Sequence, residues 1–565
     1  MADPKGLANA RRRIGPKGLP DGRGWADGKV WLATLLLSAY PAIRLSAHTS
    51  IRLSAQDTTA GRAVYEKYCA GCHSETGAGD GPAAPYMLPR PRDFTGAIFK
   101  IRTTASGQLP SDADFMRAID LGLPGTAMPG WKDRLSDRER RDVMAYIKTY
   151  SAFFADTTQR PTPLQFGKAP GGGSSAEALQ IGRQFYDSLA CRKCHGDRGR
   201  GDGPSAPTLH DDADFPIFAA DLAQSWRFRG GGTVEDIYHR LRTGIDGTPM
   251  PSFSDLIDQQ ILTEEELWRL AQYARSLSPE QPPEVRDVIH AAQLAQPVPV
   301  SPNDSAWSRV DRYWFPLVGQ VILKPRWFTP AVSGVWVQAV HDGTTLAMRV
   351  SWDDRSRSPD SAWLEFTGRV LASVASDDSA PRSLALWPDR LAVQFPVALP
   401  ESPQAMERPY FLMGSATQPV YQWRWTSGPL EDTLSVAAGG AGAAGLARGI
   451  ERFDPLVDAT LGAQAVYDQG EWRVVFTRSL ATVDTSNQLQ FRAGRAIPVA
   501  FFAWDGSNGE TGPRMAVSSW YFLSLDTPTP PRVFVSPVLA MVLTLGLGWM
   551  VGRRAQRRVR EPRGA

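Results

Sequence analysis

The sequence has few cysteines and few histidines. Only 4 of its 565 residues are cysteine and 7 are histidine. All four cysteines lie in two short motifs, so no thiol remains for a disulfide framework, which argues against a disulfide-stabilised fold. The formal net charge of +3 is small for this length. It therefore gives no overall signal for nucleic-acid binding.

The two cysteine motifs have the same pattern. Residues 69–73 and 191–195 both read Cys-x-x-Cys-His, the attachment sequence of a c-type haem. Two thiols bond to the porphyrin vinyl groups, and the imidazole binds the iron. A chance match, a structural zinc site or a buried thiol pair could explain one motif, but two motifs that use every cysteine favour haem. The predicted attachment residues are Cys69, Cys72, Cys191 and Cys194, and the predicted iron ligands are His73 and His195.

The surroundings of the motif repeat as well. Gly-Asp-Gly-Pro at 79–82 returns at 201–204, and Gly-Thr-x-Met-Pro places Met128 and Met250 at the same offset of 122 residues. Each methionine lies 55 residues after its motif histidine. A thioether opposite the imidazole would complete a six-coordinate iron. Core packing is the alternative role for a methionine, but the repeated setting favours ligation.

The repeat defines two predicted domains. Residues 56–155 and 176–280 are expected to be all-α, with the linker 156–175 between them, and the last helix of each begins with a capping box at 136–139 or 263–266. Both domains resemble the class I cytochrome c family through the haem motif and the later methionine. The resemblance implies two compact helical domains, each enclosing one haem c. The remaining histidines of the second domain are predicted to lie on the surface: His210 and His239.

The two ends of the chain carry targeting signals. Residues 1–55 form a basic leader with a short apolar run at 30–43, which is typical of an export signal; an uncleaved anchor is the alternative. Residues 533–551 carry no charge and are long enough to span a bilayer, and a basic tail follows at 552–565. The positive-inside rule then predicts a C-terminal transmembrane helix. The bulk of the chain would lie on the periplasmic side of a bacterial cytoplasmic membrane, and the C-terminus in the cytoplasm.

The pattern changes after the Pro-rich linker predicted at 281–304. Residues 305–527 contain short β-rich runs separated by turn signals, which predict an antiparallel β-sandwich. One hairpin turn, Asp342-Gly343, is expected to leave His341 solvated. The Gly/Ala run at 437–447 is expected to be a mobile loop.

Five segments of this region carry a second resemblance: Arg390–Pro396, Phe411–Ser415, Pro419–Trp425, Phe502–Gly506 and Ala516–Trp520. They resemble the haem-b (gamma) subunit of ethylbenzene dehydrogenase and its relatives. Those relatives include the electron-transfer subunits of dimethyl sulfide dehydrogenase, chlorate and selenate reductases, and nitrite oxidoreductase. The resemblance implies one non-covalent haem b in the β domain, and molybdopterin and iron–sulfur subunits as partners.

The axial ligands of that haem b are only partly matched. The family uses a methionine and a lysine, and Met413 matches the methionine. Met515 stands where the lysine is expected, and the only lysine between 305 and 527 is Lys324, outside the matching segments. Either Met413 and Met515 both ligate the iron, or another second ligand is used. The alternative is that both methionines are packing residues in a domain without haem.

Irons that are ligated on both faces have no vacant position for a substrate, so no catalytic residue is predicted. We expect a membrane-anchored cytochrome with two haem c groups and one haem b. It would relay electrons between a molybdenum/iron–sulfur oxidoreductase, of which nitrite oxidoreductase is the leading candidate, and a cytochrome or terminal oxidase. Two alternatives stay open: a haem oxidoreductase with its own substrate, and a dihaem cytochrome with a haem-free β-sandwich binding module.

Overall fold

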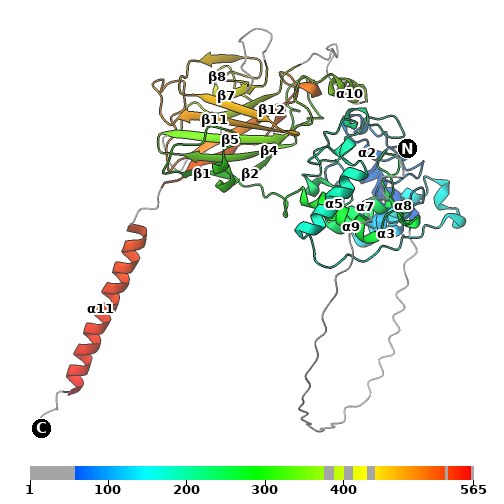
Figure 1. Ribbon diagram of the computed structural model, residues 1–565, viewed down its shortest axis with the longest axis horizontal. Coiled ribbons are helices and arrows are strands. Elements are labelled where there is room, and N and C mark those ends of the chain that lie inside the picture. The colour runs from blue at the N-terminus through cyan, green and yellow to red at the C-terminus, as the bar shows by residue number, and fades with distance from the viewer. Residues whose placement is uncertain (1–56, 374–386, 400–411, 429–439, 528–531, 561–565) are drawn as a thin grey trace, which may run out of the picture. The chain divides into compact units, whose positions relative to one another are not determined.

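The fold comes from a computed structural model, which describes residues 57–373, 387–399, 412–428, 440–527 and 532–560. The predicted leader at 1–55 lies outside the described residues. Three kinds of structure follow along the chain: two groups of helices, a large β-sheet and one long terminal helix (Figure 1).

The first group of helices contains the first cysteine motif. Its helix α1 packs on α4, and Gly61 makes this crossing possible, because a Cβ there would lie 2.0 Å from the carbonyl oxygen of Asp142. Tyr65 is fully buried beneath the motif and donates its hydroxyl to the Ser74 carbonyl at 2.7 Å. The elements are α1 (Thr58–Tyr68), α2 (Ala70–His73), η3 (Ala84–Tyr86), α3 (Asp112–Leu121) and α4 (Asp137–Lys148).

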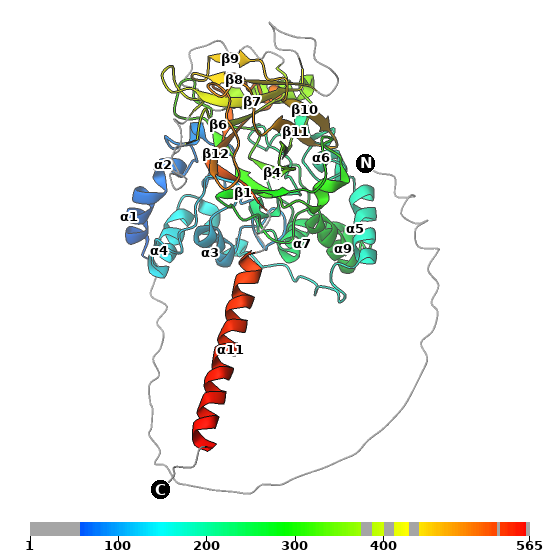
Figure 2. The same ribbon diagram turned by 90° about the vertical axis from the view of Figure 1, so that its left-hand side faces the viewer.

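The second group repeats this arrangement (Figure 2). Helix α5 packs on α9, and a Cβ on Gly182 would lie 2.1 Å from the carbonyl oxygen of Arg269. Compared with the first group, the second has one additional residue between its first helix and its cysteine motif. Ala190 takes a left-handed conformation at this point (φ 59°). The main elements are α5 (Ala176–Ser188), α6 (Arg192–His195), η6 (Ala206–Thr208), α7 (Val234–Thr243), α8 (Ser254–Asp258) and α9 (Glu264–Ser276).

Both predicted capping boxes are confirmed. Ser136 and Thr263 accept bonds from the third backbone N–H of α4 and α9, and the glutamates at 139 and 266 bond back. Two further boxes begin α3 and α7, with Asp114 and Asp236 in the glutamate position. These two boxes were not predicted, because aspartate is shorter than the glutamate or glutamine of the usual capping-box pattern.

The β domain is a 14-stranded mixed sheet folded into two layers. Figure 1 shows β7, β8 and β12 above β11, β5 and β4. The path of neighbouring strands is β10-β11-β5-β4-β1-β14-β12-β6-β7-β8-β9, with β13 beside β12 and β3, and β2 beside β4. The strands are β1 (Val288–Gln293), β2 (Tyr313–Pro316), β3 (Val318–Gly319), β4 (Gly334–His341), β5 (Thr345–Asp353), β6 (Arg390–Pro396), β7 (Val420–Thr426), β8 (Ala441–Ala447), β9 (Phe453–Leu456), β10 (Gly462–Tyr467), β11 (Glu471–Ser479), β12 (Ala496–Trp504), β13 (Ala516–Val517) and β14 (Tyr521–Leu525).

Strand β1 differs from the prediction in two ways. It lies inside the predicted linker 281–304, and both of its pairings are parallel, whereas the other strand pairs of the described sheet are antiparallel. Its first residues, 288–291, pair with β14, and its last two, 292–293, pair with β4. The prolines on either side made this segment resemble a linker in sequence. In the structure, one end of the strand pairs with β14 and the other with β4, which belong to different layers.

The space between the layers is the main hydrophobic core. Met348 and Trp352 of β5 meet Leu391 and Val393 of β6 there, and all four are fully buried. Side chains alternate between the two faces of a strand. The even-numbered residues of β6 therefore point to the opposite, outer face of their layer.

Two local predictions in the β domain were wrong. Residues 437–439 of the predicted Gly/Ala loop lie outside the described residues, and residues 441–447 form β8, paired with β7 and β9, because small residues allow close strand contact. His341 is buried at 2% exposure, and both ring nitrogens are used: Nε2 bonds the Asp526 carbonyl at 2.7 Å and Nδ1 accepts from Gly343. The sequence also gave no sign of helix α10 (Ser361–Ser373) between β5 and β6.

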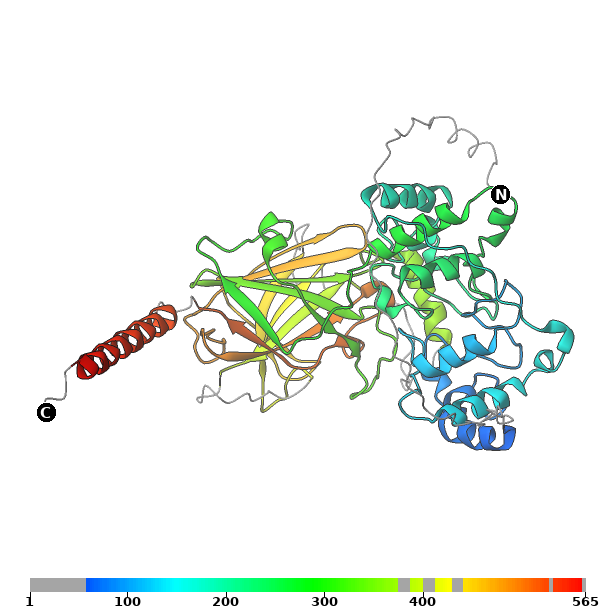
Figure 3. The same ribbon diagram turned by 90° about the horizontal axis from the view of Figure 1, so that it is seen from below.

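Helix α11 (Arg532–Arg560) covers the predicted span 533–551 (Figure 3). Its segment Val533–Arg557 is long and apolar enough to cross a membrane. Its large apolar side chains are exposed, which differs from the core helix of a soluble protein.

Candidate haem sites

The two cysteine motifs have the same local structure. In the first, Cys69 is both the C-cap of α1 and the N-cap of α2, the single turn that carries Cys72 and His73. In the second, Cys191 begins the corresponding turn, α6. All four thiols are free and partly buried. Burial raises the pKa of Cys69 to about 12 and that of Cys191 to about 11, because it disfavours the thiolate.

The motif histidines are oriented by backbone carbonyls. Nδ1 of His73 lies 3.0 Å from the Arg92 carbonyl, and Nδ1 of His195 lies 2.9 Å from the Ala220 carbonyl. A carbonyl oxygen can only accept, so each Nδ1 carries the proton and each Nε2 is left with its lone pair. Burial also lowers the pKa of both rings, which favours the neutral form. A hydrogen bond from Nδ1 to a backbone carbonyl is one that metal-binding histidines commonly make.

The two methionine loops also match each other. The backbone N–H of Met128 donates to the Thr126 hydroxyl at 3.1 Å, and that of Met250 donates to the Thr248 hydroxyl at 3.3 Å. Both methionines are partly buried. Of the other histidines in the second domain, His210 is exposed, as predicted, whereas half-buried His239 stacks on Phe166 at 4.0 Å.

Met413 and Met515 lie in one cluster, although a hundred residues separate them. Both are 0% exposed. The cluster lies on the outer face of the β12–β6–β7–β8 layer and not in the core between the layers, as the alternation of β6 and β12 residues requires. We call it the outer-face cluster; it consists of Leu412, Met413, Val420, Ala447, Ala392, Ala500, Phe502, Trp504, Met515, Val517 and Trp520.

The loop that carries Met413 is strained. Leu412, Met413 and Gly414 all have left-handed backbones, with φ of 60°, 64° and 73°. This conformation costs roughly 1–2 kcal/mol for each residue that has a side chain. A Cβ on Gly414 would lie 2.7 Å from the Gln418 carbonyl, so glycine is required there. Strain of this kind is concentrated at functional sites, which supports a ligand role for Met413.

Polar side chains share the outer face with the two methionines. Gln394 of β6 and Gln422 of β7 are opposite each other and fully buried. The guanidinium of Arg424 lies on the same face, with Nη2 3.8 Å from the Met413 sulfur. Burial, and then the charge of Arg390, lower the pKa of Arg424 to about 9. Sequence reasoning missed these residues. Their signal is the alternation of polar and apolar residues along β6 and β7, which places polar side chains on one face of two neighbouring strands.

The second group of helices contacts the β domain close to its cysteine motif. Cys194 packs against a hydrophobic cluster that joins Ala206 and Ala219 of this group to residues of α10, namely Trp363, Phe366 and Val370. An ion pair between Arg200 and Asp353, with 3.2 Å between Nη1 and Oδ1, lies on the same side.

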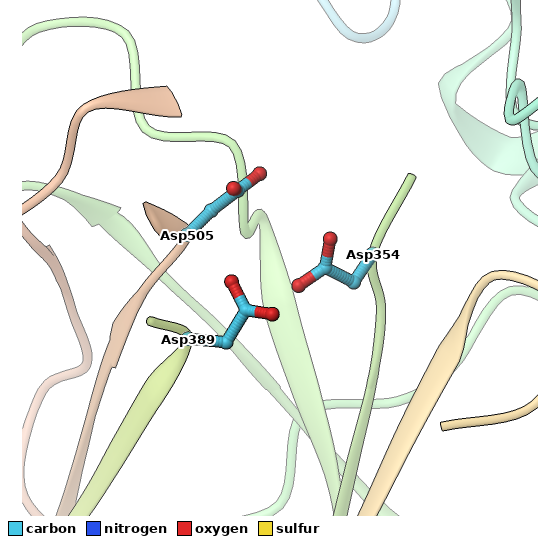
Figure 4. Close-up of side chains that lie close together, drawn as sticks. All are labelled: Asp354, Asp389 and Asp505. Atoms are coloured by element: carbon cyan, nitrogen blue, oxygen red, sulfur yellow. The ribbon is translucent and has the colours of Figure 1, made fainter. Parts of the chain in front are cut away.

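Three carboxylates form a second feature of the β domain (Figure 4). Asp354, Asp389 and Asp505 stand at the ends of β5, β6 and β12, are buried, and have ligand oxygens within 4.8 Å of one another. Burial raises the pKa of all three, and neighbouring carboxylates raise those of Asp354 and Asp505 further. Hard cations bind such oxygens, but Asp389 already accepts hydrogen bonds from neighbouring segments of the chain. It accepts bonds from the backbone N–H of Ser358, the backbone N–H of Gly506 and the indole of Trp472.

Three family models match the chain. Residues 56–147 match cytochrome c oxidase, cbb3-type, subunit III, and residues 179–278 match cytochrome c. Residues 304–450 and 455–516 match ethylbenzene dehydrogenase.

Similar proteins are of the same kinds. A protein of Haloferax mediterranei described as a respiratory nitrate reductase heme subunit is 28% identical over 40% of this chain and 69% of its own length. The chlorate reductase subunit gamma of Ideonella dechloratans is 24% identical over 43% of this chain and 86% of its own. Among solved structures, a chain of the Kuenenia stuttgartiensis reducing HAO-like protein complex is 40% identical over 40% of this chain and 97% of its own, with a TM-score of 0.37. This chain thus joins two cytochrome c domains to a gamma-type domain of the ethylbenzene dehydrogenase family.

Proposed function

We propose that this chain is the membrane-anchored electron-transfer subunit of an oxidoreductase complex. It would hold two covalent haem c groups and one non-covalent haem b. Each bound haem would supply a one-electron carrier. The residues of the chain fix these carriers in place and close both faces of each iron.

The observation that carries the proposal is the repeated histidine geometry. In both motifs a backbone carbonyl holds the Nδ1 proton, so Nε2 of His73 and Nε2 of His195 are free to bind iron. Met128 and Met250, in loops of matching structure, would bind the opposite faces. His/Met pairs saturate a haem iron and suit electron transfer.

The residues of the outer-face cluster fit a haem b. Two buried methionines from different loops meet there, and one of them is held by a strained backbone. Met413 and Met515 would be the two iron ligands, with Met515 in place of the lysine of the family. Two thioethers would favour ferrous iron and therefore a high reduction potential.

The partners follow from the kind of relatives that the chain has. The nitrate reductase and chlorate reductase relatives suggest a complex with a molybdopterin subunit and an iron–sulfur subunit. Within that group we propose a nitrite-oxidoreductase-type complex. Electrons would pass between the β domain and the second haem c, beside the hydrophobic cluster that α10 shares with the second group of helices and against which Cys194 packs. A soluble cytochrome or a terminal oxidase would lie at the other end.

Helix α11 would anchor the complex. We propose that its basic end lies in the cytoplasm and the haem domains outside, in agreement with the positive-inside rule. A variant that ends at residue 527 should leave the membrane fraction and keep its haems. Membrane retention of this variant would contradict the anchor.

The test of the proposed function is a haem count. We expect the purified protein to give two haem c and one haem b per chain in a pyridine haemochrome assay, and to co-purify with a molybdenum-containing subunit. Two haem c without haem b would favour the binding-module alternative. A chain without covalent haem would contradict the proposal entirely.

A further inference from the structure

Several hydrogen-bond donors on the outer face lack an acceptor. Nε2 of Gln394, Nε1 of Trp520 and Nε of Arg390 are buried without any partner. The side chains of Gln394 and Trp520 are only 0% and 5% exposed. Each buried donor that lacks an acceptor costs about 1–3 kcal/mol. Several such donors on the face that carries Met413 and Met515 point to a ligand that supplies acceptors.

The glutamines and Arg424 form one directed row. Nε of Arg424 donates to Oε1 of Gln422 at 2.8 Å, and Nε2 of Gln422 donates to Oε1 of Gln394 at 2.8 Å. Arginine can only donate, so it fixes the orientation of both amides. Every acceptor in the row is then used, and donors remain at both ends.

The charge on this face is also unbalanced. Within the described part of the chain, neither Arg424 nor Arg390 forms an ion pair. Asp389 and Glu510 act on Arg390, whereas the charged group that acts on Arg424 is Arg390 itself. A partly buried cation without a counter-ion is costly. An anionic ligand would remove that cost.

The Arg424 guanidinium is held in one orientation. It stacks on the ring of Phe453 with 3.9 Å between its central carbon and the ring centroid, while Nη2 points to the Met413 sulfur. A planar guanidinium fixed in this way is suited to bind a carboxylate through two parallel hydrogen bonds.

We propose that Arg424 binds a propionate carboxylate of the haem b. Gln394 and Trp520 supply further donors, and Arg390 is the second cation of the site. The inference rests on the proposed haem b between Met413 and Met515. Arg424 is a positioning residue: it holds the porphyrin edge, and its positive charge opposes that of ferric iron. It therefore raises the reduction potential of the haem.

The experiment compares haem b retention in the full-length protein, purified in detergent. The variants are Arg424→Gln and Arg424→Lys. The matched control is Arg349→Gln, because Arg349 is also a partly buried strand arginine but lies on β5 in the other layer. The rate of haem b transfer to apomyoglobin and the midpoint potential of haem b are measured.

We expect Arg424→Gln to release haem b at least about 30-fold faster, because a buried charge pair is broken, and to lower its potential. For Arg424→Lys we expect a release rate and a potential between those of the wild type and Arg424→Gln, since lysine keeps the charge but cannot form two parallel hydrogen bonds with a carboxylate. Arg349→Gln should match the wild type. In all of them the two haem c groups stay in place.

The outcomes separate the two claims. If wild type contains haem b, and Arg424→Gln keeps both its release rate and its potential, the propionate inference is wrong and the proposed function stands. If wild type contains two haem c and no haem b, both fail. Should Arg424→Gln not accumulate, Gln394→Leu removes one free donor without a change of charge. An unchanged release rate in that variant would also overturn the inference.

Discussion

The cytochrome domains and the β domain present their candidate sites in opposite ways. Each candidate haem c site is concentrated in five consecutive residues and one later methionine, and the whole pattern occurs twice. The candidate haem b site is assembled from the loop at 412–414, two paired strands and the segment after 514. Covalent attachment requires a fixed local spacing, which can be read directly. A non-covalent site requires only that distant segments bring their side chains to one face of the sheet. That arrangement becomes visible only when the pairing register of the strands is known.

The largest effect should come from removing one attachment motif. Replacement of Cys191 and Cys194 by alanine removes both thiols, so we expect covalent haem to fall from two groups to one per chain by mass spectrometry. The same change at Cys69 and Cys72 is the matched control and should remove the other haem. Haem b should remain in both variants. A double variant that still carries two covalent haems would show that these motifs are not the attachment sites.

A methionine-to-leucine pair tests the β domain. Met413→Leu keeps the volume but removes the sulfur, so we expect loss of haem b or a five-coordinate iron that binds carbon monoxide. Met348→Leu is the matched control: Met348 is also 0% exposed, but lies in the core between the layers. It should cost less than about 1.5 kcal/mol and leave haem b unchanged. Equal haem b spectra in the two variants would place the haem elsewhere.

The two haem c irons can be compared with each other. Met128→Leu and Met250→Leu each remove one proposed axial ligand while the thioether attachments remain. We therefore expect each variant to bind about one carbon monoxide per chain when reduced, and its altered haem c to lose potential. If Met250→Leu stays closed to carbon monoxide, another group, such as His239, completes the second iron.

The smallest expected effect concerns the buried carboxylates. Their raised pKa values mean that the protonated forms fold best, so stability is fully present below the unfolded pKa of about 4 and is lost as the pH rises. Glu510, with a pKa of about 7, adds to this loss between about pH 4.5 and 7. Asp354→Asn removes one repulsive charge, and we expect a gain on the order of 1 kcal/mol at pH 8 and little at pH 4.

Thermal unfolding at the two pH values measures this gain. A different result would be that Asp354→Asn is less stable than the wild type at pH 8 and that a chelator destabilises the wild type. Together these would indicate a bound cation at Asp354, Asp389 and Asp505. Unchanged stability at both values would mean that the cluster keeps its protons throughout the range.

Much of the fold could be predicted because its signals are local. The haem motifs, the two glutamate capping boxes, the strands of the hairpin around Asp342 and the apolar terminal helix all depend on residues close in sequence. Strand β1 could not be predicted, because its two parallel partners lie about 50 and 230 residues away. The donors of the outer face could not be predicted for the same reason. Gln394 and Arg424 can be assigned to one site only when the β6–β7 register places them on the face that carries Met413.

The most direct test of the account is a carbon monoxide titration of the reduced, full-length protein with all its haems counted. If every iron is closed on both faces by His73, Met128, His195, Met250, Met413 and Met515, the native protein binds far less than one carbon monoxide per chain. Binding of one equivalent or more by the undamaged protein would reveal an open iron. The chain would then be a site of chemistry and not a relay.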